Sequence, residues 1–227
     1  MIKTLLWDID GTLLDFGKAE DYGIRKCFEV FGLGKCTDEM LARYSKINRK
    51  YWEMLERNEL TKPEVLHGRF EEFFQTENIK FDKISDFNIE YQYRLGDKVF
   101  FCDNALETVQ QLKGKINQYA VTNGTILAQS RKLSQSGLDK IFDDVFISDE
   151  IGFEKPSVKF FDAVQEKIGK FSRDEVMIIG DSLTSDIRGG NNAGIISCWY
   201  NPLGLENKDG LKIDFEIKDI AEVLNII

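Results

Sequence analysis

Apolar residues along the chain form short continuous runs that alternate with longer stretches of helical spacing. The first run, Leu5-Leu6-Trp7, ends in Asp8-Ile9-Asp10-Gly11-Thr12, which predicts a buried strand followed at once by a turn. Further runs lie at 119–121, 145–147, 176–179 and 195–200. Stretches with apolar residues three or four positions apart separate them. This alternation predicts an α/β fold, a Rossmann-like parallel sheet with helices on both faces.

Residues 16–97 show a different pattern, because helical spacing recurs there with no convincing strand. The amphipathic stretches lie at 22–31, 40–55, 61–74 and 86–95. Thr61-Lys62-Pro63-Glu64 has the form of a capping box with proline in the first turn. We therefore expect a helical insert over 16–97 in a core made of residues 1–15 and 98–227. The many aromatic residues of the insert are interpreted as its own packed interior.

Composition limits the classes of function. Of 227 residues, 39 are acidic and 30 basic, and the net charge of -9 disfavours a nucleic-acid polymer or an anionic membrane as partner. The N-terminal apolar run is short and broken by Asp8, so it predicts neither a signal peptide nor a membrane span. Four scattered cysteines without a C-x-x-C pair indicate reduced thiols and a cytoplasmic protein. A single histidine, His67, makes a Ser-His-Asp triad or a histidine-rich metal site a poor hypothesis.

Polar residues follow the apolar runs at the same relative place. They are Asp8 with Asp10, Thr122-Asn123-Gly124, Glu154-Lys155-Pro156, and Gly180-Asp181-Ser182 with Asp186. Because the carboxyl ends of parallel strands meet at one edge, we expect these side chains in one cleft. Close carboxylates repel, so such a site holds a divalent cation or keeps one carboxyl protonated, and oxygen ligands favour Mg2+. Structural alternatives stay open, since Lys155 could be a solvated charge and Asp186 a helix N-cap.

The same four segments, in this order, resemble the four motifs of the haloacid dehalogenase superfamily. The insert over 16–97 is similar to the helical cap domain of that superfamily. Its dehalogenases lack the second aspartate of the first motif, whereas its phosphatases and phosphomutases carry it, so Asp10 implies phosphoryl transfer. The chain crosses between insert and core near 16–17 and again near 96–102, which predicts a cap that opens and closes over the cleft.

The resemblance implies a chemistry that begins with Asp8. Its carboxylate attacks the phosphorus of a monoester and gives an aspartyl-phosphate, which replaces one hard displacement by two easier ones. Asp10, kept protonated by its neighbour, donates a proton to the leaving alkoxide and later takes one from the hydrolytic water. Thr122 bonds the phosphoryl oxygens and Lys155 neutralises charge as that group flattens, so both are catalytic candidates. The phosphate-binding set is Gly11, Thr122, Asn123 and Lys155.

The resemblance also implies a metal site. Mg2+ is expected on the Asp8 carboxylate, the backbone carbonyl of Asp10 and the Asp181 carboxylate. Asp186 is expected behind these ligands, where it orients water or Lys155.

Stretches in both insert and core resemble the pyrimidine 5'-nucleotidases of the superfamily, which act in bacteria on non-standard pyrimidine nucleotides. The matching stretches are Asn48 with Trp52, 66–70, 147–152, 185–194 and Trp199 with Asn201. Gly11 is a departure, because some relatives have glutamate there. Asn48, Trp52 and Arg69 could then contact the base or ribose, although Trp52 could equally be a core aromatic.

Other functions stay open at this stage. One alternative is a phosphatase of sugar phosphates or phosphoglycolate, and another is a phosphomutase. A third, from a different class, is a sensor that binds a phosphometabolite without turnover, although binding alone needs no nucleophile paired with an acid. In every case the expected partner is a small-molecule phosphomonoester, and the chain could be a monomer or a homodimer.

Overall fold

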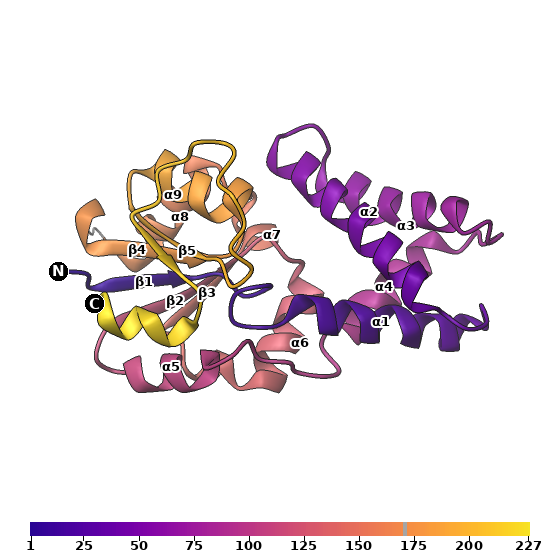
Figure 1. Cartoon of the computed structure of the whole chain (residues 1–227), viewed down its shortest axis with the longest axis horizontal. Helices are drawn as coiled ribbons and strands as arrows, with labels where there is room; N and C mark the ends of the chain where they lie inside the picture. Colours follow the sequence, from indigo (N-terminus) through magenta and orange to yellow (C-terminus); the bar gives the residue numbers. More distant parts are fainter. Residues whose placement is uncertain (170–171) are drawn as a thin grey trace.

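The computed structural model describes residues 1–169 and 172–227, and a parallel sheet lies at the centre of one half of the molecule (Figure 1). Its strand order is β3-β2-β1-β4-β5-β6, and each neighbouring pair runs parallel. The strands are β1 (Thr4–Trp7), β2 (Asn117–Thr122), β3 (Asp144–Ile147), β4 (Val176–Gly180), β5 (Ile196–Tyr200) and β6 (Phe215–Ile217). The predicted α/β fold with a parallel sheet is confirmed.

Helices cover both faces of this sheet. Successive strand residues point to opposite faces, so each buried strand contributes side chains to a hydrophobic cluster on either side. Leu5 packs in one hydrophobic cluster with Val109, while Leu6 packs in the other with Phe160. The first face is covered by α5 (Ala105–Leu112), α6 (Ile126–Ser136) and the 3-10 turn at Ile220–Asn225, and the second by α8 (Val158–Ile168) and α9 (Arg188–Ala193). A single turn, α7 (Ser148–Ile151), follows β3.

Four further helices lie together beyond the carboxyl ends of the strands (Figure 1). They are α1 (Phe16–Phe31), α2 (Asp38–Glu56), α3 (Lys62–Thr76) and α4 (Ile84–Arg94). They enclose a further hydrophobic cluster rich in aromatic residues, which includes Tyr44, Phe70 and Phe87, and Ala128 of α6 also belongs to it. The capping box at the start of α3 is present, with Glu64 accepting a hydrogen bond of 2.7 Å from the backbone of Thr61.

Some element boundaries differ from those the sequence predicts. The helix expected from residue 22 begins at Phe16, because Asp15 caps it by accepting a hydrogen bond of 3.0 Å from the backbone of Lys18. A π-helical turn, Leu183–Ile187, directly precedes α9. Strand β6 carried no sequence signal, since two of its three residues are exposed.

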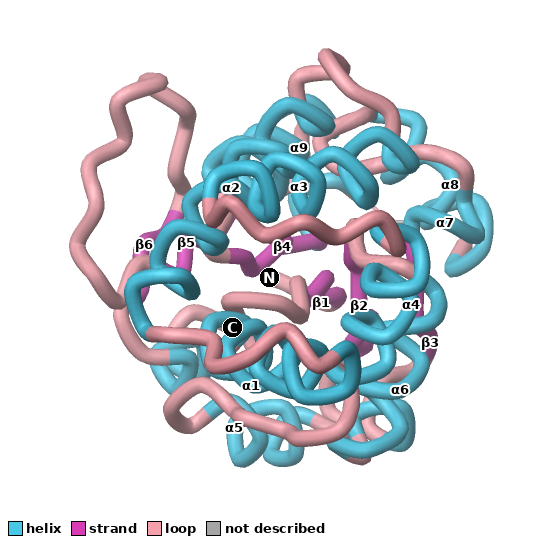
Figure 2. Tube along the Cα trace, turned by 90° about the vertical axis from the view of Figure 1, so that its right-hand side faces the viewer, coloured by secondary structure: helices cyan, strands magenta, loops and turns pink. Residues whose placement is uncertain are grey.

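Seen from the side of helices α1 to α4, these helices lie in front of the strand ends, and a long loop between β5 and β6 projects to one side (Figure 2). Among residues 1–169 and 172–227, no helix combines the length and the apolar character that a membrane crossing requires.

Candidate active site

A cleft of about 870 Å³ lies between the strand ends and the helices α1 to α4. The sheet side of the cleft is lined by Asp8, Asp10, Gly11, Thr122, Asn123, Lys155, Asp181 and Asp186. The helical side is lined by Glu20, Asn48, Trp52, Glu56 and Arg69. All eleven residues singled out in the sequence therefore face one cleft, and the roles expected of them stay predictions.

Lys155 is a buried cation on the sheet side. Its Nζ lies 2.7 Å from an oxygen of Asp8 and 2.7 Å from an oxygen of Asp186, and it donates to the carbonyl oxygen of Val121 at 2.9 Å. Burial lowers the pKa of Lys155, but the carboxylates of Asp186 and Asp8 outweigh it and raise the pKa above its usual range. Lys155 is therefore a fixed positive charge against the end of β1.

Asp8 directly follows β1, and its backbone N–H donates to Ile179 of β4 at 2.9 Å. Burial raises the pKa of its carboxyl to about 7, against the attraction of Lys155, which lowers it. Thr12 donates to the second carboxylate oxygen of Asp8 at 3.2 Å. A buried carboxylate with one cation beside it and an open side toward the cleft can act as a nucleophile.

Three carboxylates on the sheet side form a group with the chemistry of a magnesium site. Oxygens of Asp8, Asp181 and Asp186 lie within 4.8 Å of one another. Burial and the neighbouring Asp8 raise the pKa of Asp181 well above its usual range. Carboxylate oxygens are hard ligands, and a divalent cation between them relieves their repulsion, so the donor set fits Mg2+.

Gly11 makes room for this acidic group. A Cβ at this position would lie 2.6 Å from Oδ2 of Asp181, and the backbone φ of +95° is one that only glycine adopts without strain. Thr12 holds the backbone of Asp181, because its hydroxyl accepts a hydrogen bond of 3.0 Å from the Asp181 backbone N–H. The turn after β1 thus shapes the strand end of β4.

Asp10 has partners that the sequence did not reveal. Gln129 Nε2 and Lys132 Nζ, both from α6, each donate to one of its carboxylate oxygens at 2.6 Å. The sequence contains only a weak indication of these partners. Gln129 and Lys132 are three residues apart, on the face of the helix that also carries apolar residues.

Asn123 holds the segment that carries Lys155. Its amide donates to the Lys155 carbonyl oxygen at 2.8 Å and accepts from the Lys155 backbone N–H at 2.8 Å. Thr122 accepts a hydrogen bond of 3.0 Å from the backbone of Gly124. The second and third predicted motifs are thus joined directly, and both ends of the Asn123 amide are engaged with backbone.

The helical side of the cleft carries a buried polar chain. Asn48 donates to Glu20 at 2.8 Å and accepts from Arg69 at 2.9 Å, and Arg69 also donates to Asn88 at 2.9 Å. Burial raises the pKa of Glu20 to about 7, against its hydrogen bonds and the charge of Arg69. The Trp52 ring centroid lies 6.0 Å from Cζ of Arg69. Sequence reasoning missed Glu20 and Asn88, whose partners come from other helices.

Several polar contacts join the helical side to the sheet side. Thr184, in the turn after β4, donates a hydrogen bond to Glu56 of α2, and Lys62 of α3 donates to Ser148 at 2.6 Å. Lys62 also forms an ion pair with Asp149. These contacts close the cleft at its rim in the arrangement that the structure describes.

Comparison with known proteins places this geometry in a family. The sequence model described as haloacid dehalogenase-like hydrolase matches residues 2–194. The chain is 36% identical to HAD-hydrolase YfnB of Bacillus subtilis, with 99% of this chain and 95% of YfnB covered. It is 34% identical to pyrimidine 5'-nucleotidase PynA of Streptococcus pneumoniae, covering 99% and 94%. It is 27% identical to pyrimidine 5'-nucleotidase YjjG of Escherichia coli, covering 98% and 96%.

Solved structures agree with this placement. The crystal structure of YfnB bound to magnesium, described as revealing interdomain movement, superposes with a TM-score of 0.93 at 35% identity over 99% of this chain and 98% of that one. The L-2-haloacid dehalogenase of Xanthobacter autotrophicus superposes with a TM-score of 0.78 at 16% identity over 100% and 98%, which shows a shared fold.

Proposed function

The chain belongs to the haloacid dehalogenase-like hydrolase family, and from this premise we propose that it is a Mg2+-dependent phosphatase that hydrolyses small phosphomonoesters through an aspartyl-phosphate on Asp8. The observation that carries the proposal is the strand end at Asp8. There a buried carboxylate lies 2.7 Å from the ammonium of Lys155 and within 4.8 Å of two further carboxylates. A buried site of this kind is built for a group that carries several negative charges and a compensating cation.

In the first step the Asp8 carboxylate attacks phosphorus and the bond between phosphorus and the ester oxygen breaks. The electron pair of that bond goes to the leaving oxygen, which takes a proton from the carboxyl of Asp10. Lys155 neutralises charge on the phosphoryl oxygens, and Thr122 with nearby backbone N–H groups bonds them. In this account Asn123 contributes by holding the backbone of Lys155.

In the second step a water molecule attacks the phosphorus of the aspartyl-phosphate, and Asp10 takes its proton. Inorganic phosphate leaves, and the Asp8 carboxylate and the Asp10 carboxyl are restored. Mg2+ would be held by Asp8, Asp181 and the backbone carbonyl of Asp10, with Asp186 behind them, and when bound it neutralises charge on the transferring group. YfnB, which superposes closely, was crystallised with magnesium.

For the substrate we propose a pyrimidine nucleoside 5'-monophosphate. Two of the relatives similar over nearly the whole chain are named pyrimidine 5'-nucleotidases. A cleft of about 870 Å³ is large enough for a nucleotide, and ligand sites fall at roughly 300–1,000 Å³. The polar chain of Glu20, Asn48 and Arg69 with the nearby Trp52 ring supplies hydrogen bonding and an aromatic face for a base.

We further propose that residues 16–97 act as a cap on the core of residues 1–15 and 98–227. Three observations support it: the four helices have their own hydrophobic cluster, they lie over the strand ends, and they meet the rim through Glu56 and Lys62. Closure over the cleft would exclude water from the aspartyl-phosphate until the alcohol has left.

The test is phosphate release from a panel of pyrimidine and purine nucleoside monophosphates, sugar phosphates and phosphoglycolate, each with Mg2+ and with a chelator. Preferred hydrolysis of deoxyuridine- or thymidine-type monophosphates that the chelator abolishes supports the full proposal. Metal-dependent release from other esters alone keeps the mechanism and rejects the nucleotide. Absence of release from every compound contradicts the proposal and favours a binding protein.

A further inference from the structure

Both oxygens of the Asp10 carboxylate are bound from helix α6. Gln129 Nε2 donates to Oδ2 and Lys132 Nζ donates to Oδ1, each at 2.6 Å. Residues three apart lie on the same face of a helix, so the two donors approach the carboxylate together. With a different donor on each oxygen, the carboxylate is fixed in position and in rotation.

These two donors are buried at a cost to folding. Gln129 is 1% exposed and Lys132 is 3% exposed. A buried ammonium or amide destabilises the fold unless it is paired, and Gln129 Oε1 has no hydrogen-bond partner among the residues that the structure describes. Lys132 Nζ has the Asp10 carboxylate and, 5.0 Å away, the Phe16 ring. The Asp10 carboxylate is therefore the hydrogen-bond partner that the structure gives to each of these two buried donors.

The absence of a side chain at Gly124 leaves the space through which the Gln129 side chain reaches Asp10. A Cβ at residue 124 would lie 2.1 Å from Gln129 Nε2 and 2.8 Å from its Cδ. The backbone of Gly124 does not have a positive φ, so the glycine is required by space and not by backbone conformation. The loop after β2 is thus shaped around the side chain that reaches Asp10.

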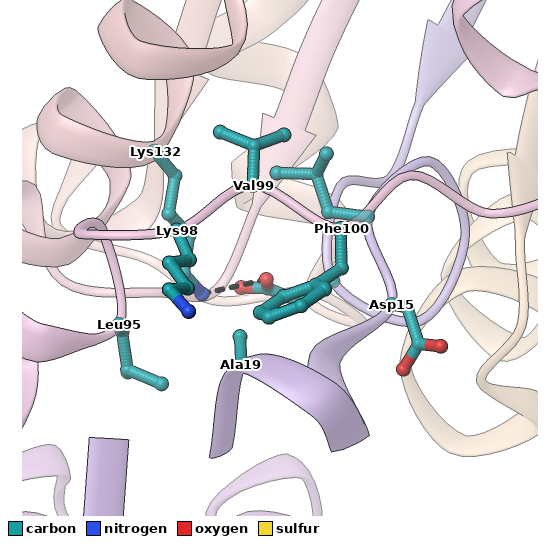
Figure 3. Close-up of a pocket in the computed structure, with 9 residues that line it drawn as sticks. Asp15, Ala19, Leu95, Lys98, Val99, Phe100 and Lys132 are labelled. Carbon is teal, nitrogen blue, oxygen red and sulfur yellow. Dashed lines mark hydrogen bonds and ion pairs between the residues drawn. The ribbon is translucent and has the colours of Figure 1, made fainter. Parts of the chain in front are cut away.

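Lys132 also lies where the chain passes between core and helices. It lines a cavity of about 10 Å³ with residues of both crossings, shown in Figure 3: Asp15 and Ala19 of the first, and Leu95, Lys98, Val99 and Phe100 of the second. Asp10 also lines this cavity, where its carboxylate forms the ion pair of 2.6 Å with Lys132. Lys132, which binds Asp10, therefore lies where the chain crosses between the core and the helices α1 to α4.

We propose that Gln129 and Lys132 are positioning residues that hold Asp10 for proton transfer to the leaving alkoxide. The inference rests on the proposed function, because it concerns the step in which the phosphorus–oxygen bond breaks and the proton passes from Asp10 to the ester oxygen. The two contacts are those of the ionised carboxylate, the form that Asp10 takes once this proton has left and in which it later takes a proton from water. Gln129 and Lys132 act through Asp10 and not on the phosphoryl group. Their loss misplaces the proton donor and leaves the nucleophile Asp8 and the cation Lys155 intact.

The test separates proton donation from the other parts of the reaction by the choice of leaving group. Lys132→Met is compared with the natural protein in single turnovers with enzyme in excess and Mg2+ present. One substrate is a pyrimidine nucleoside monophosphate, whose alkoxide needs a proton, and the other is p-nitrophenyl phosphate, whose phenolate leaves without one. We expect first-turnover nucleoside release to fall about 100-fold and nitrophenol release less than about 3-fold, since general acid catalysis contributes about 10²–10⁴-fold. Equal losses, or no loss with the nucleotide, overturn the proposal.

Three further variants guard against a purely structural effect. Lys132→Arg keeps a cationic donor and is expected to recover most of the nucleotide rate. Gln129→Leu and Gly124→Ala, which remove or displace the other donor, are expected to show the same selective loss, and they carry the test if Lys132→Met does not fold. Lys98→Met is the matched control, because Lys98 is an exposed lysine that lines the same cavity. Its rates with both substrates are expected to equal those of the natural protein.

Failure of the inference can be told apart from failure of the proposed function. If the natural protein hydrolyses both substrates and the variants lose both rates equally, only the positioning role is overturned. If the natural protein with Mg2+ hydrolyses neither substrate, the phosphatase proposal fails and the positioning role fails with it.

Discussion

The two sides of the cleft hold buried charge in different ways. On the sheet side, Lys155 contacts Asp8 and Asp186 directly, at 2.7 Å each. On the helical side, Glu20 and Arg69 are bridged by the amide of Asn48, at 2.8 Å and 2.9 Å. Direct ion pairs fix charge at one point, where a reacting group needs it. A bridged pair spreads polar groups over a wider surface, which suits recognition of a ligand's hydrogen-bonding groups.

The largest effect is expected from the nucleophile of the sheet side. Asp8→Asn keeps the size of the side chain but removes the attacking carboxylate, and its amide can accept from only one of the two donors, Lys155 and Thr12. We expect phosphate release to fall by about 10⁴-fold or more, in line with losses of other catalytic nucleophiles. Asp162→Asn, an exposed position on α8, is the control and should leave the rate unchanged. An active Asp8→Asn variant would remove the basis of the site assignment.

Lys155→Met tests whether the direct ion pairs hold the sheet side together. Without the ammonium, Asp8 and Asp186 stay buried without their shared cation, and breaking a buried pair costs about 3–5 kcal/mol. We expect that loss of unfolding free energy in denaturant titrations, together with a fall in turnover of about 100-fold or more. Lys159→Met, an exposed lysine four residues along, should change neither quantity. Unchanged stability of Lys155→Met would show that the charges are not coupled as described.

Glu20→Gln tests the bridged pair through pH. The pKa of Glu20 is raised from 4.5 to about 7 by burial. A carboxyl with a higher pKa in the folded chain stabilises the fold fully below its unfolded pKa, and this contribution is lost as the pH rises toward the folded pKa. The natural protein should therefore lose stability relative to the variant between pH 4.5 and about 7, by up to about 3 kcal/mol at about 1.36 kcal/mol per pKa unit.

The measurement is denaturant unfolding of both proteins across this pH range, so that groups common to both cancel. Glu71→Gln, an exposed glutamate on α3, provides the matched control. A difference between Glu20→Gln and the natural protein that does not vary with pH would contradict a raised pKa at Glu20.

The smallest effect is expected from Arg69→Met, which sharpens the distinction between chemistry and recognition. It removes the cation of the bridged pair, whose hydrogen bonds go to Asn48 of α2 and Asn88 of α4. We expect kcat/KM for a pyrimidine nucleoside monophosphate to fall about 10-fold, and that for p-nitrophenyl phosphate to stay within about 3-fold. Arg43→Met, an ion-paired arginine on the outer surface of α2, is the control. Equal losses with both substrates would place Arg69 in the fold of the helices and not in recognition.

The sheet side could be predicted because strand ends have a fixed relation to one another. Leu5 and Leu6 enter different hydrophobic clusters, and a run of this kind must end at the carboxyl edge, where Asp8 lies. Parallel pairing then brings Thr122 and Asp181 to the same edge without further information. Asp8 and Asp181 thus follow from the order of the strands, whereas Lys155 and Asp186 lie in turns beyond the strand ends, and their place beside Asp8 was expected from the order of the four motifs together.

The supporting contacts could not be predicted, because they depend on which helices face each other. Gln129 and Lys132 are polar residues inside an amphipathic helix, where a solvated surface is the ordinary interpretation. Glu20 meets Asn48 only because α1 packs against α2, and no local pattern shows that pairing. Strand β6 escaped prediction for another reason, since its exposed residues lack the apolar run that marked the other strands.

In the proposed mechanism Asp8 carries the phosphoryl group, and trapping of this aspartyl-phosphate tests it directly. The protein is mixed with Mg2+ and a substrate that it hydrolyses, quenched in acid after a fraction of one turnover, and digested for mass spectrometry. We predict a phosphoryl group on the peptide that contains Asp8, absent when substrate is omitted and absent from Asp8→Asn. Hydrolysis that proceeds with no phosphoryl group on that peptide at any time point, together with an active Asp8→Asn variant, would contradict an aspartyl-phosphate on Asp8.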